Sequence, residues 1–296
     1  MFSIIIPTLN NLEYLKLCIK SINKNSHFNH EIVPHVNIGT DGTLEYLNEN
    51  DIKYTYTKEN VGICEGVNTA SKISKKDYIL YAHDDFYFSP GWDLILKKEI
   101  DRIGHNRFYL SGTMINNGQI EFNCGNTIED FDENKFLNNY KRYNHYDFQG
   151  STWAPHLIHR DIWNKVGGLS EEFFPGTGSD PDLNMKLWKI GIRIFKGINN
   201  FKVYHFGSIV TRKYKNHPKI RTESGSRGGK IFLLKWGFSI GFFKKFVIQS
   251  DTLYKGELTE PRKNIQFYYF LLLNRIYYLY VRFIYNFMNK KKLNIK

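Results

Sequence analysis

The first hundred residues alternate between short apolar runs and amphipathic stretches. Apolar and β-branched side chains predominate in residues 2–6, 31–33, 52–56 and 78–82, and each run has the length of a buried strand or of part of one. The first run ends at Pro7, where we expect the strand to end. Between the runs, apolar residues recur at helical spacing, first at Leu12, Leu15, Ile19 and Ile22, then over residues 43–50 and 62–73. Strands that alternate with helices predict an α/β fold with a mostly parallel, doubly wound, Rossmann-like sheet.

A polar segment follows each of these predicted strands. These segments are residues 7–10, 37–41, 60–62 and 83–85. Open α/β sheets bind ligands outside the carboxyl ends of their strands, where loops from neighbouring strands meet. These four segments are therefore candidates for one binding site.

The rest of the chain is less regular. Residues 108–148 mix asparagines with aromatics and predict loops and short strands, and helical periodicity returns at 161–166 and 181–190. Residues 211–229 are basic and rich in glycine and serine, and residues 265–288 are rich in tyrosine. We expect one domain over residues 1–210 and a basic, aromatic-rich, mainly helical extension over 211–296.

Composition excludes some classes of protein. With 296 residues, 42% of them hydrophobic, the chain can bury a large core and is neither disordered nor fibrous. Its net charge of +12 suits an anionic partner such as a nucleotide diphosphate, a nucleic acid or an acidic membrane surface. The three cysteines form no C-x-x-C pair, so neither a disulfide framework nor a zinc site is indicated. We see no secretory signal and expect a cytoplasmic protein.

Two neighbouring carboxylates, Asp84 and Asp85, follow the predicted strand at 78–82. Adjacent carboxylates repel each other, and a divalent cation that also binds phosphate oxygens relieves this repulsion. The alternative is a solvated turn or a helix cap.

A second acidic group and a lone histidine come later in the chain. Asp180 stands where an N-cap is expected, with Pro181 at the first helical position, which also permits a purely structural role. We expect its carboxylate to be exposed near the positive end of the helix and therefore ionised. His205 ends another apolar run, as either a metal ligand or a structural residue.

Together these groups resemble the inverting glycosyltransferases of family 2, which have the GT-A fold. The resemblance covers about residues 2–210. On the donor side it rests on the opening strand and nucleotide loop S-I-I-I-P-T-L-N from Ser3, on T-D-G-T from Thr40, and on Asn60-Val61-Gly62 with Asn68. Asp85 matches the second carboxylate of the family's D-x-D motif, and His205 matches a histidine that often completes the metal site. Gly167-Gly168-Leu169 followed by Ser179-Asp180 matches the region that ends in the family's Glu-Asp pair.

The resemblance implies transfer of a sugar, with inversion, from a nucleotide-diphosphate donor to a hydroxyl of a glycan, glycolipid or other saccharide. Asp180 would be the general base, and Asp85 and His205 would hold Mn²⁺ or Mg²⁺. Basic residues in 212–227 would stabilise the leaving diphosphate. The implied donor-side residues are Pro7, Thr8, Asn10, Asn37, Asp41, Asn60, Gly62, Asn68 and Asp84, and the acceptor-side residues are Trp153, Ser179 and Asp182.

Three positions depart from the family pattern. His83 replaces the first D-x-D aspartate, so metal binding would depend on Asp85, with Asp84 and His205 assisting. Ser179 replaces the glutamate before the base, and Val36 replaces a carboxylate that commonly contacts the nucleotide. These changes leave open a catalytically inactive sugar-binding relative.

Two other classes of function compete with this interpretation. A nucleotidyltransferase would need a basic, glycine-rich loop after the first strand, which residues 7–10 do not offer. The positive charge and 16% aromatic content would suit a nucleic-acid-binding protein, but no recognition motif is visible. We therefore expect no nucleic-acid partner.

The apolar segment at 267–288 could span a bilayer by length, but Asn274, Arg275, Arg282 and Asn286 interrupt it. Arg275 and Arg282 are seven residues apart and share a helix face, and lysines follow at 290–292. The pattern predicts a basic helix in an anionic membrane interface, as for a peripheral membrane protein. The alternative is a helix packed on the protein or on another subunit.

Overall fold

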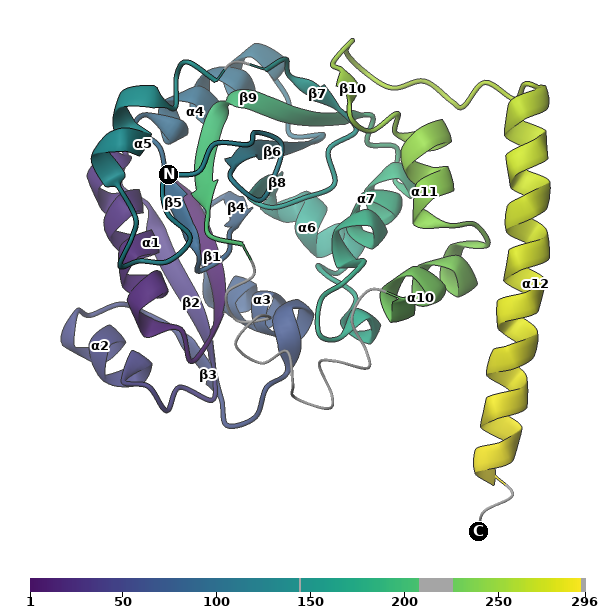
Figure 1. Cartoon of the computed structure of the whole chain (residues 1–296), viewed down its shortest axis with the longest axis horizontal. Helices are drawn as coiled ribbons and strands as arrows, with labels where there is room; N and C mark the ends of the chain where they lie inside the picture. The colour runs from purple at the N-terminus through teal and green to yellow at the C-terminus, as the bar shows by residue number, and fades with distance from the viewer. Residues whose placement is uncertain (144, 208–225, 294–296) are drawn as a thin grey trace.

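The computed structural model describes residues 1–143, 145–207 and 226–293. Within them, ten strands form one mixed sheet with helices on both faces (Figure 1). This confirms the predicted α/β class. The strands are β1 (Phe2–Leu9), β2 (Glu31–Asn37), β3 (Thr55–Thr57), β4 (Tyr78–Tyr81), β5 (Phe86–Phe88), β6 (Phe108–Ile115), β7 (Phe148–Gln149), β8 (His156–His159), β9 (Ile194–His205) and β10 (Thr252–Leu253).

The sheet order is β10-β7-β9-β6-β8-β4-β1-β2-β3, and β5 pairs with β9. The first four strands pair in parallel, as the alternating pattern predicts, and β6 pairs in parallel with β9. β8 runs antiparallel between β4 and β6. The start of β8 therefore lies beside the carboxyl end of β4.

The helices pack on this sheet and in the C-terminal extension. Figure 1 shows α1 and α4 on one side of the sheet and α3, α6 and α7 on the other. The helices are α1 (Leu12–Asn25), α2 (Thr43–Glu49), α3 (Gly62–Ile73), α4 (Trp92–Ile103), α5 (Glu133–Asn139), α6 (Arg160–Val166), the 3-10 helix η1 (Glu171–Phe173), α7 (Ser179–Lys189), α10 (Ser226–Trp236), α11 (Ile240–Phe242), the π-helix η2 (Phe243–Val247) and α12 (Ile265–Leu293).

The main core lies between the sheet and these helices, and the predicted apolar stripes form much of it. Leu15, Ile19 and Ile22 of α1 are buried, as are Val67 and Ala70 of α3. The spacing of three and four residues directs these side chains to the sheet. The periodicity that predicts the helices therefore also predicts their buried faces.

The first strand is longer than predicted, because β1 continues through Pro7 to Leu9. The carbonyl of Ile5 accepts a hydrogen bond from Ala82 N at 3.0 Å, so Ile5 faces β4. Pro7, two residues on, faces the same edge, but β4 has already ended at Tyr81. The missing N–H of Pro7 therefore interrupts no strand pairing there.

Two other predicted strand positions were wrong. The strand expected at 52–56 is the shorter β3, because Ile52 N donates to Leu47 O (2.9 Å) and closes the end of α2. Where loops and short strands were expected, β6 forms a long buried strand. Its Ser111, Gly112 and Thr113 weaken the apolar pattern, but β8 and β9 flank the strand and bury it.

The C-terminal extension is helical, as predicted, and α12 packs on α10 and α11 along one side (Figure 1). The rings of Phe267 and Phe242 lie 5.2 Å apart, and Ser239 N donates to Asn274 Oδ1 at 2.7 Å. Most other side chains described in α12 are exposed. Among the described helices, none is both long enough and apolar enough to cross a membrane.

Candidate functional site

The residues after β4 meet the end of β9. β5 pairs antiparallel with β9, and the register places Phe86 opposite His205. This pairing brings the segment 83–85 against His205, although the two are more than a hundred residues apart in sequence. One ligand atom from each of His83, Asp85 and His205 lies within 4.8 Å of the others.

The hydrogen-bond partner of His205 determines which ring nitrogen faces Asp85. His205 Nδ1 lies 3.0 Å from the carbonyl oxygen of Asn117, which can only accept a hydrogen bond. In the neutral ring the hydrogen is therefore on Nδ1, and the lone pair is on Nε2. Nε2 lies 3.6 Å from Asp85 Oδ2, is buried and has no hydrogen-bond partner in the described part of the chain. A lone pair that faces a carboxylate oxygen suits a shared cation.

His83 completes this cluster. Its Nδ1 lies 4.0 Å from Asp85 Oδ1, and its ring stacks on Phe86. Loss of solvent around the ring lowers the pKa of His83 to about 4, so the imidazole is neutral and able to bind a metal. Two imidazoles and one carboxylate fit Mn²⁺ better than Mg²⁺, which prefers oxygen ligands. The residue that departs from the D-x-D pattern therefore lies among the candidate ligands.

Asp84 points away from this cluster. Its Oδ2 accepts a hydrogen bond from Thr8 Oγ1 at 2.7 Å, which joins the ends of β4 and β1. Burial, and next the charge of Asp85, raise the pKa of Asp84 to about 7. Its position matches the predicted donor side better than an assisting role at the metal.

The predicted donor loops are joined by asparagine side chains. Asn37 Oδ1 accepts from Val61 N (2.9 Å), and Asn37 Nδ2 donates to Thr8 O (3.4 Å). The side chain of Asn10, a residue with φ of +45°, makes two hydrogen bonds with Thr40. The loops that follow β1, β2 and β3 therefore meet at one end of the sheet, as expected.

Asn60 and Gly62 shape the loop that enters α3. Asn60 Oδ1 accepts from Gly62 N at 2.9 Å. Gly62 has φ of +77°, and a Cβ there would lie 2.8 Å from the Phe174 ring. A side chain at this position would therefore clash with the segment that leads to α7.

Asp41 and Asn68, both predicted on the donor side, have structural partners. Asp41 Oδ2 accepts from Leu12 N at 2.9 Å and so caps α1 from a neighbouring loop. Asn68 Oδ1 accepts from Leu169 N (2.9 Å), and its Nδ2 donates to Leu169 O (2.8 Å). These contacts hold the loops in place.

Asp180 differs from the sequence prediction in two respects. It is the second residue of α7, whose N-cap is Gly178, so it is not the cap. Its side chain is only 26% exposed, and Oδ1 is buried without a hydrogen-bond partner among the described residues. Burial raises the pKa of Asp180 to about 7, opposed by Lys244, so the expected exposed, fully ionised carboxylate was wrong.

Tyr81 and His156 connect Asp180 to the histidine-aspartate cluster. Burial raises the pKa of Tyr81 well above its usual value, and the charge of Asp180 adds to the increase, with smaller contributions from Asp84 and Asp85. Tyr81 pairs with His156 in the β4–β8 register. His156 Nδ1 lies 3.7 Å from Asp180 Oδ1. All these groups therefore lie at one end of β4 and β8.

Sequence reasoning did not identify His156. It lies in the short apolar strand β8, where a single histidine gives no motif. Only its position in the fold suggests a role, because α7 brings Asp180 to the start of β8.

The predicted acceptor-side residues have mixed positions. Ser179 Oγ donates to Gly176 O (2.7 Å), and Trp153 Nε1 donates to Gly112 O (2.7 Å) with its ring half-buried. Asp182 is buried, and its Oδ1 accepts from Trp236 Nε1 at 2.8 Å and lies 2.9 Å from Lys235 Nζ. Asp182 therefore joins α7 to α10.

Of the basic segment expected at 212–227, residues 212–225 lie outside the described residues, and the Arg227 side chain donates to Phe174 O.

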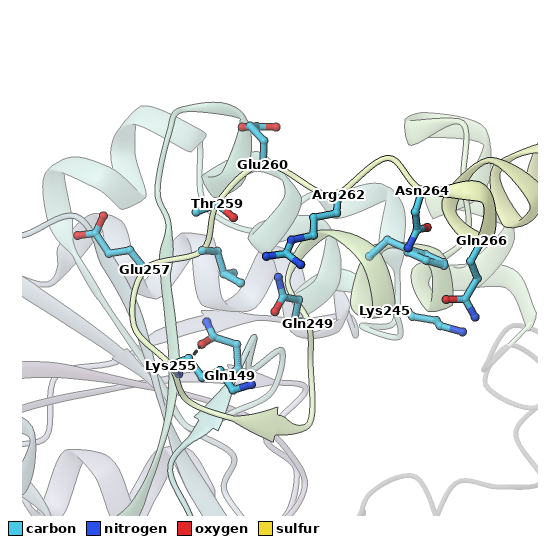
Figure 2. Close-up of a pocket in the computed structure, with 12 residues that line it drawn as sticks. Gln149, Lys245, Gln249, Lys255, Glu257, Thr259, Glu260, Arg262, Asn264 and Gln266 are labelled. Carbon is cyan, nitrogen blue, oxygen red and sulfur yellow. Dashed lines mark hydrogen bonds between the residues drawn. The ribbon is translucent and has the colours of Figure 1, made fainter.

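A separate cavity of about 550 Å³ lies between β7 and residues 245–266, with Lys245, Arg262 and several amides around it (Figure 2). It contains none of the predicted site residues.

Comparisons with known proteins identify a family match and a similar fold. The model of glycosyl transferase family 2 matches residues 3–163. A crystal structure of S. aureus TarS 1-349 is similar in fold, with a TM-score of 0.52 and 17% identity over 78% of this chain and 68% of that one. Its complex with UDP gives a TM-score of 0.53 and 17% identity, over 83% of this chain and 72% of that one. Its complex with UDP-GlcNAc gives a TM-score of 0.50 and 16% identity, over 82% of this chain and 74% of that one. Among curated proteins, no sequence matches the chain.

Proposed function

The chain belongs to glycosyl transferase family 2, and from this membership we propose that it is an inverting transferase with Asp180 as its general base. The donor is a nucleoside diphosphate sugar, and the acceptor is a hydroxyl of a glycan, glycolipid or other saccharide. The supporting observation is the position of Asp180 at the same end of β4 and β8 as the cluster of His83, Asp85 and His205.

Asp180 has the protonation behaviour that a base needs. A pKa of about 7 leaves a substantial fraction of the group ionised at neutral pH, and the carboxylate still has a strong tendency to take a proton. Asp180 removes the proton from the acceptor hydroxyl as that oxygen attacks the anomeric carbon. The bond from this carbon to the diphosphate oxygen breaks at the same time, and the nucleoside diphosphate leaves with the electron pair. A single displacement inverts the configuration.

The donor diphosphate binds at the ends of β1 and β4. Loops after β1, β2 and β3 form the nucleotide side, held together by Asn10 and Asn37. A divalent cation bound by His83, Asp85 and His205 would neutralise charge on the departing diphosphate. The neutral His83 ring and the lone pair on His205 Nε2 favour this ligand set, with Mn²⁺ preferred.

The first donors to test are UDP sugars. The related fold of S. aureus TarS has been seen with UDP and with UDP-GlcNAc. In this chain Val36 is fully buried and offers no carboxylate to the nucleotide. We therefore infer that backbone groups and the side chains of the loop asparagines provide base and ribose contacts.

An inactive sugar-binding relative is the second candidate. Ser179 and His83 depart from the family pattern, but His83 lies in the candidate metal cluster and Asp180 lies at the same end of β4 and β8. Both observations favour an active enzyme. Release of nucleoside diphosphate distinguishes the two candidates.

We also propose that α12 lies on an anionic membrane surface. The packed side of α12 faces α10 and α11, whereas the other side exposes large apolar residues, with Ile265 at 89%, Leu279 at 63% and Phe283 at 71%. Arg275 and Arg282 lie at the edge of this exposed side. Residues 261–296 include eight lysines and arginines and no acidic residue. This charge favours anionic lipid over a second copy of the helix, which would carry the same charge.

A donor screen tests the proposed function. The full chain would be incubated with UDP, GDP, CDP and dTDP sugars, with Mn²⁺, with Mg²⁺ or with a chelator, and free nucleoside diphosphate would be measured. We expect metal-dependent release from one class of donor and a large loss of release in Asp180→Asn. Donor binding without any release, in the presence of mixed saccharide acceptors, would support the inactive relative.

A further inference from the structure

A buried histidine adjoins the proposed base and has no role in the mechanism described so far. His156, the first residue of β8, is 1% exposed, and its ring packs against Tyr81 and Tyr109. Both ring nitrogens are buried and have no hydrogen-bond partner among the described residues. Buried polar atoms without partners are rare because each one costs free energy. A histidine that only filled space here would be worse than phenylalanine.

A neighbouring carboxylate identifies a role for this ring. Asp180 Oδ1, which also lacks a hydrogen-bond partner among the described residues, lies 3.7 Å from His156 Nδ1. A movement of less than about 1 Å would bring the two atoms to the hydrogen-bond distance of about 2.9 Å. Catalytic hydrogen bonds are often long without substrate and shorten in the complex.

We propose that His156 is a positioning residue that donates its Nδ1 hydrogen to the Asp180 carboxylate and orients the other carboxylate oxygen toward the acceptor hydroxyl. This inference rests on the proposed role of Asp180 as the base. A carboxylate oxygen can only accept, so the arrangement requires the neutral tautomer with hydrogen on Nδ1.

The neighbouring polar groups are consistent with this tautomer. Ser111 lies opposite His156 in the β6–β8 register, and its hydroxyl is also buried without a partner in the described chain. A hydroxyl on this side of the sheet is a suitable donor for the acceptor atom Nε2. Asn184, one helical turn after Asp180, donates to Ser151 O at 2.7 Å, and its own Oδ1 is buried and has no partner among the described residues. The base therefore lies within a polar cluster contributed by β6, β8 and α7.

The charge state of His156 excludes an alternative role as a second base. Burial, followed by the nearby His83, lowers the pKa of His156 to about 3. The ring therefore stays neutral near pH 7 and cannot keep a proton that Asp180 has removed. It can act on Asp180 only as a hydrogen-bond donor, which stabilises the ionised carboxylate.

Other titratable groups also face Asp180 and affect its titration. Lys244 of η2 is the cation that lowers the pKa of Asp180. Cys64 of α3, Tyr81 of β4 and Tyr109 of β6 are coupled to Asp180 by charge, and their own pKa values are raised. Asp182, on the same helix as Asp180, is paired with Lys235. The test must therefore change His156 alone and leave these groups intact.

Two variants separate hydrogen bonding from packing. His156→Phe keeps an aromatic ring against Tyr81 and Tyr109 but removes the donor, whereas His156→Gln keeps an N–H donor. The carboxyl ¹³C resonance of Asp180, assigned by its loss in Asp180→Asn, would be followed against pH. We expect His156→Phe to raise the Asp180 midpoint by about one pH unit, as for loss of a hydrogen bond to a charged group, and His156→Gln to restore most of it. Equal midpoints in all three proteins would overturn the proposal.

A spectroscopic measurement on the unmodified protein covers the case in which His156→Phe does not fold. Nitrogen-15 spectra of the His156 ring should show hydrogen on Nδ1 and no titration between about pH 5 and 8. Hydrogen on Nε2 would overturn the proposal. Neither measurement needs a sugar donor, so its outcome is independent of the transferase assay.

Kinetics then connect the pair to catalysis. A rise of about one pH unit in the Asp180 midpoint leaves about tenfold less carboxylate at pH 6, so kcat of His156→Phe at that pH should fall about tenfold while KM for the donor stays unchanged. If the midpoint rises but kcat does not follow it, Asp180 is not the base, and the failure is that of the proposed function. If the midpoint is unchanged while Asp180→Asn is inactive, only the role of His156 is wrong.

Discussion

His205 Nε2 faces Asp85 Oδ2 at 3.6 Å, with the ring hydrogen held on Nδ1 by the carbonyl of Asn117. In the neutral ring, two electron-rich atoms therefore lie close together in a buried place, which is unfavourable unless a cation lies between them. β5 and β9 fix this relationship, since their register sets His205 beside the residues after β4.

The first prediction concerns this pair. Asp85→Asn or His205→Ala should raise the Mn²⁺ concentration for half-maximal binding of a nucleoside diphosphate by at least about tenfold, because each change removes one of the proposed ligands. Calorimetric titration with Mn²⁺ and UDP measures this change. His27→Ala, at an exposed histidine after α1, serves as the control and should bind normally. Equal loss of thermal stability with and without metal, at unchanged metal affinity, would assign His205 to structure.

The second prediction concerns the choice of metal. His83→Asp creates a second carboxylate near Asp85 and removes one imidazole. Since Mg²⁺ prefers oxygen ligands, we expect the ratio of Mg²⁺-supported to Mn²⁺-supported donor binding to rise by about tenfold. The variant is assayed with each metal over a concentration series. An unchanged ratio would place His83 outside the ligand set.

The sequence predicted which loops meet better than it predicted the electrostatics around them. Parallel strands bring their following loops together, so segments 7–10, 37–41, 60–62 and 83–85 could be grouped from the pattern alone. The resemblance to family 2 added Asp85, Asp180 and His205. The predicted exposure of Asp180 was wrong because β8 and η2 pack near it, and neither long-range contact leaves a periodic signal in the sequence.

Long-range packing also determines the roles of residues that the local sequence pattern does not distinguish. Asp182 follows Asp180 by two residues, yet the two carboxyl groups point to different partners, His156 for Asp180 and Lys235 for Asp182. Asp41, which the resemblance places on the donor side, also caps α1 from a neighbouring loop. Such assignments depend on which helix packs where, which the sequence motifs do not specify.

The third prediction concerns the exposed side of α12. Arg275→Glu with Arg282→Glu should lower binding to vesicles that contain anionic phosphatidylglycerol by about tenfold or more, since each reversal removes an attractive charge and adds a repulsive one. Added salt should weaken binding of the unmodified chain. Lys72→Glu with Lys98→Glu, on exposed positions of α3 and α4, changes charge equally and is the control. Equal binding by both double variants would contradict a membrane role for α12.

The fourth prediction separates the two aspartates of α7. Asp182→Asn should lower the free energy of unfolding by about 2–3 kcal/mol, because Lys235, Trp236 and Ser170 lose a charged acceptor in a buried place. Chemical denaturation measures this loss. Below the unfolding transition the variant should keep most of its transfer activity. A stable variant that has lost transfer would instead place Asp182 in the reaction.

The last prediction begins from the pKa of Asp180, which burial raises to about 7. The pKa of an aspartate in the unfolded chain is about 3.9, which is lower than the value of Asp180 in the folded chain. Binding of a proton by Asp180 therefore stabilises the folded chain. This contribution is complete below about pH 3.9 and is lost as the pH rises through about 7. The ionised group is therefore unfavourable for folding but necessary for transfer. Transfer by the unmodified chain should fall about tenfold for each pH unit below 7.

Asp180→Asn removes both effects while it keeps the size of the side chain. At pH 8 the variant should be more stable than the unmodified chain, by at most about 4 kcal/mol, and this difference should disappear near pH 4. Its transfer rate should fall by about a hundredfold or more with donor and metal binding retained, as expected for loss of a positioned base. Denaturation at both pH values and initial rates of diphosphate release measure the two effects on the same preparation. Normal turnover in this variant would show that Asp180 does not take part in the reaction. A difference in stability that did not change with pH would show that the Asp180 carboxyl does not titrate near neutral pH.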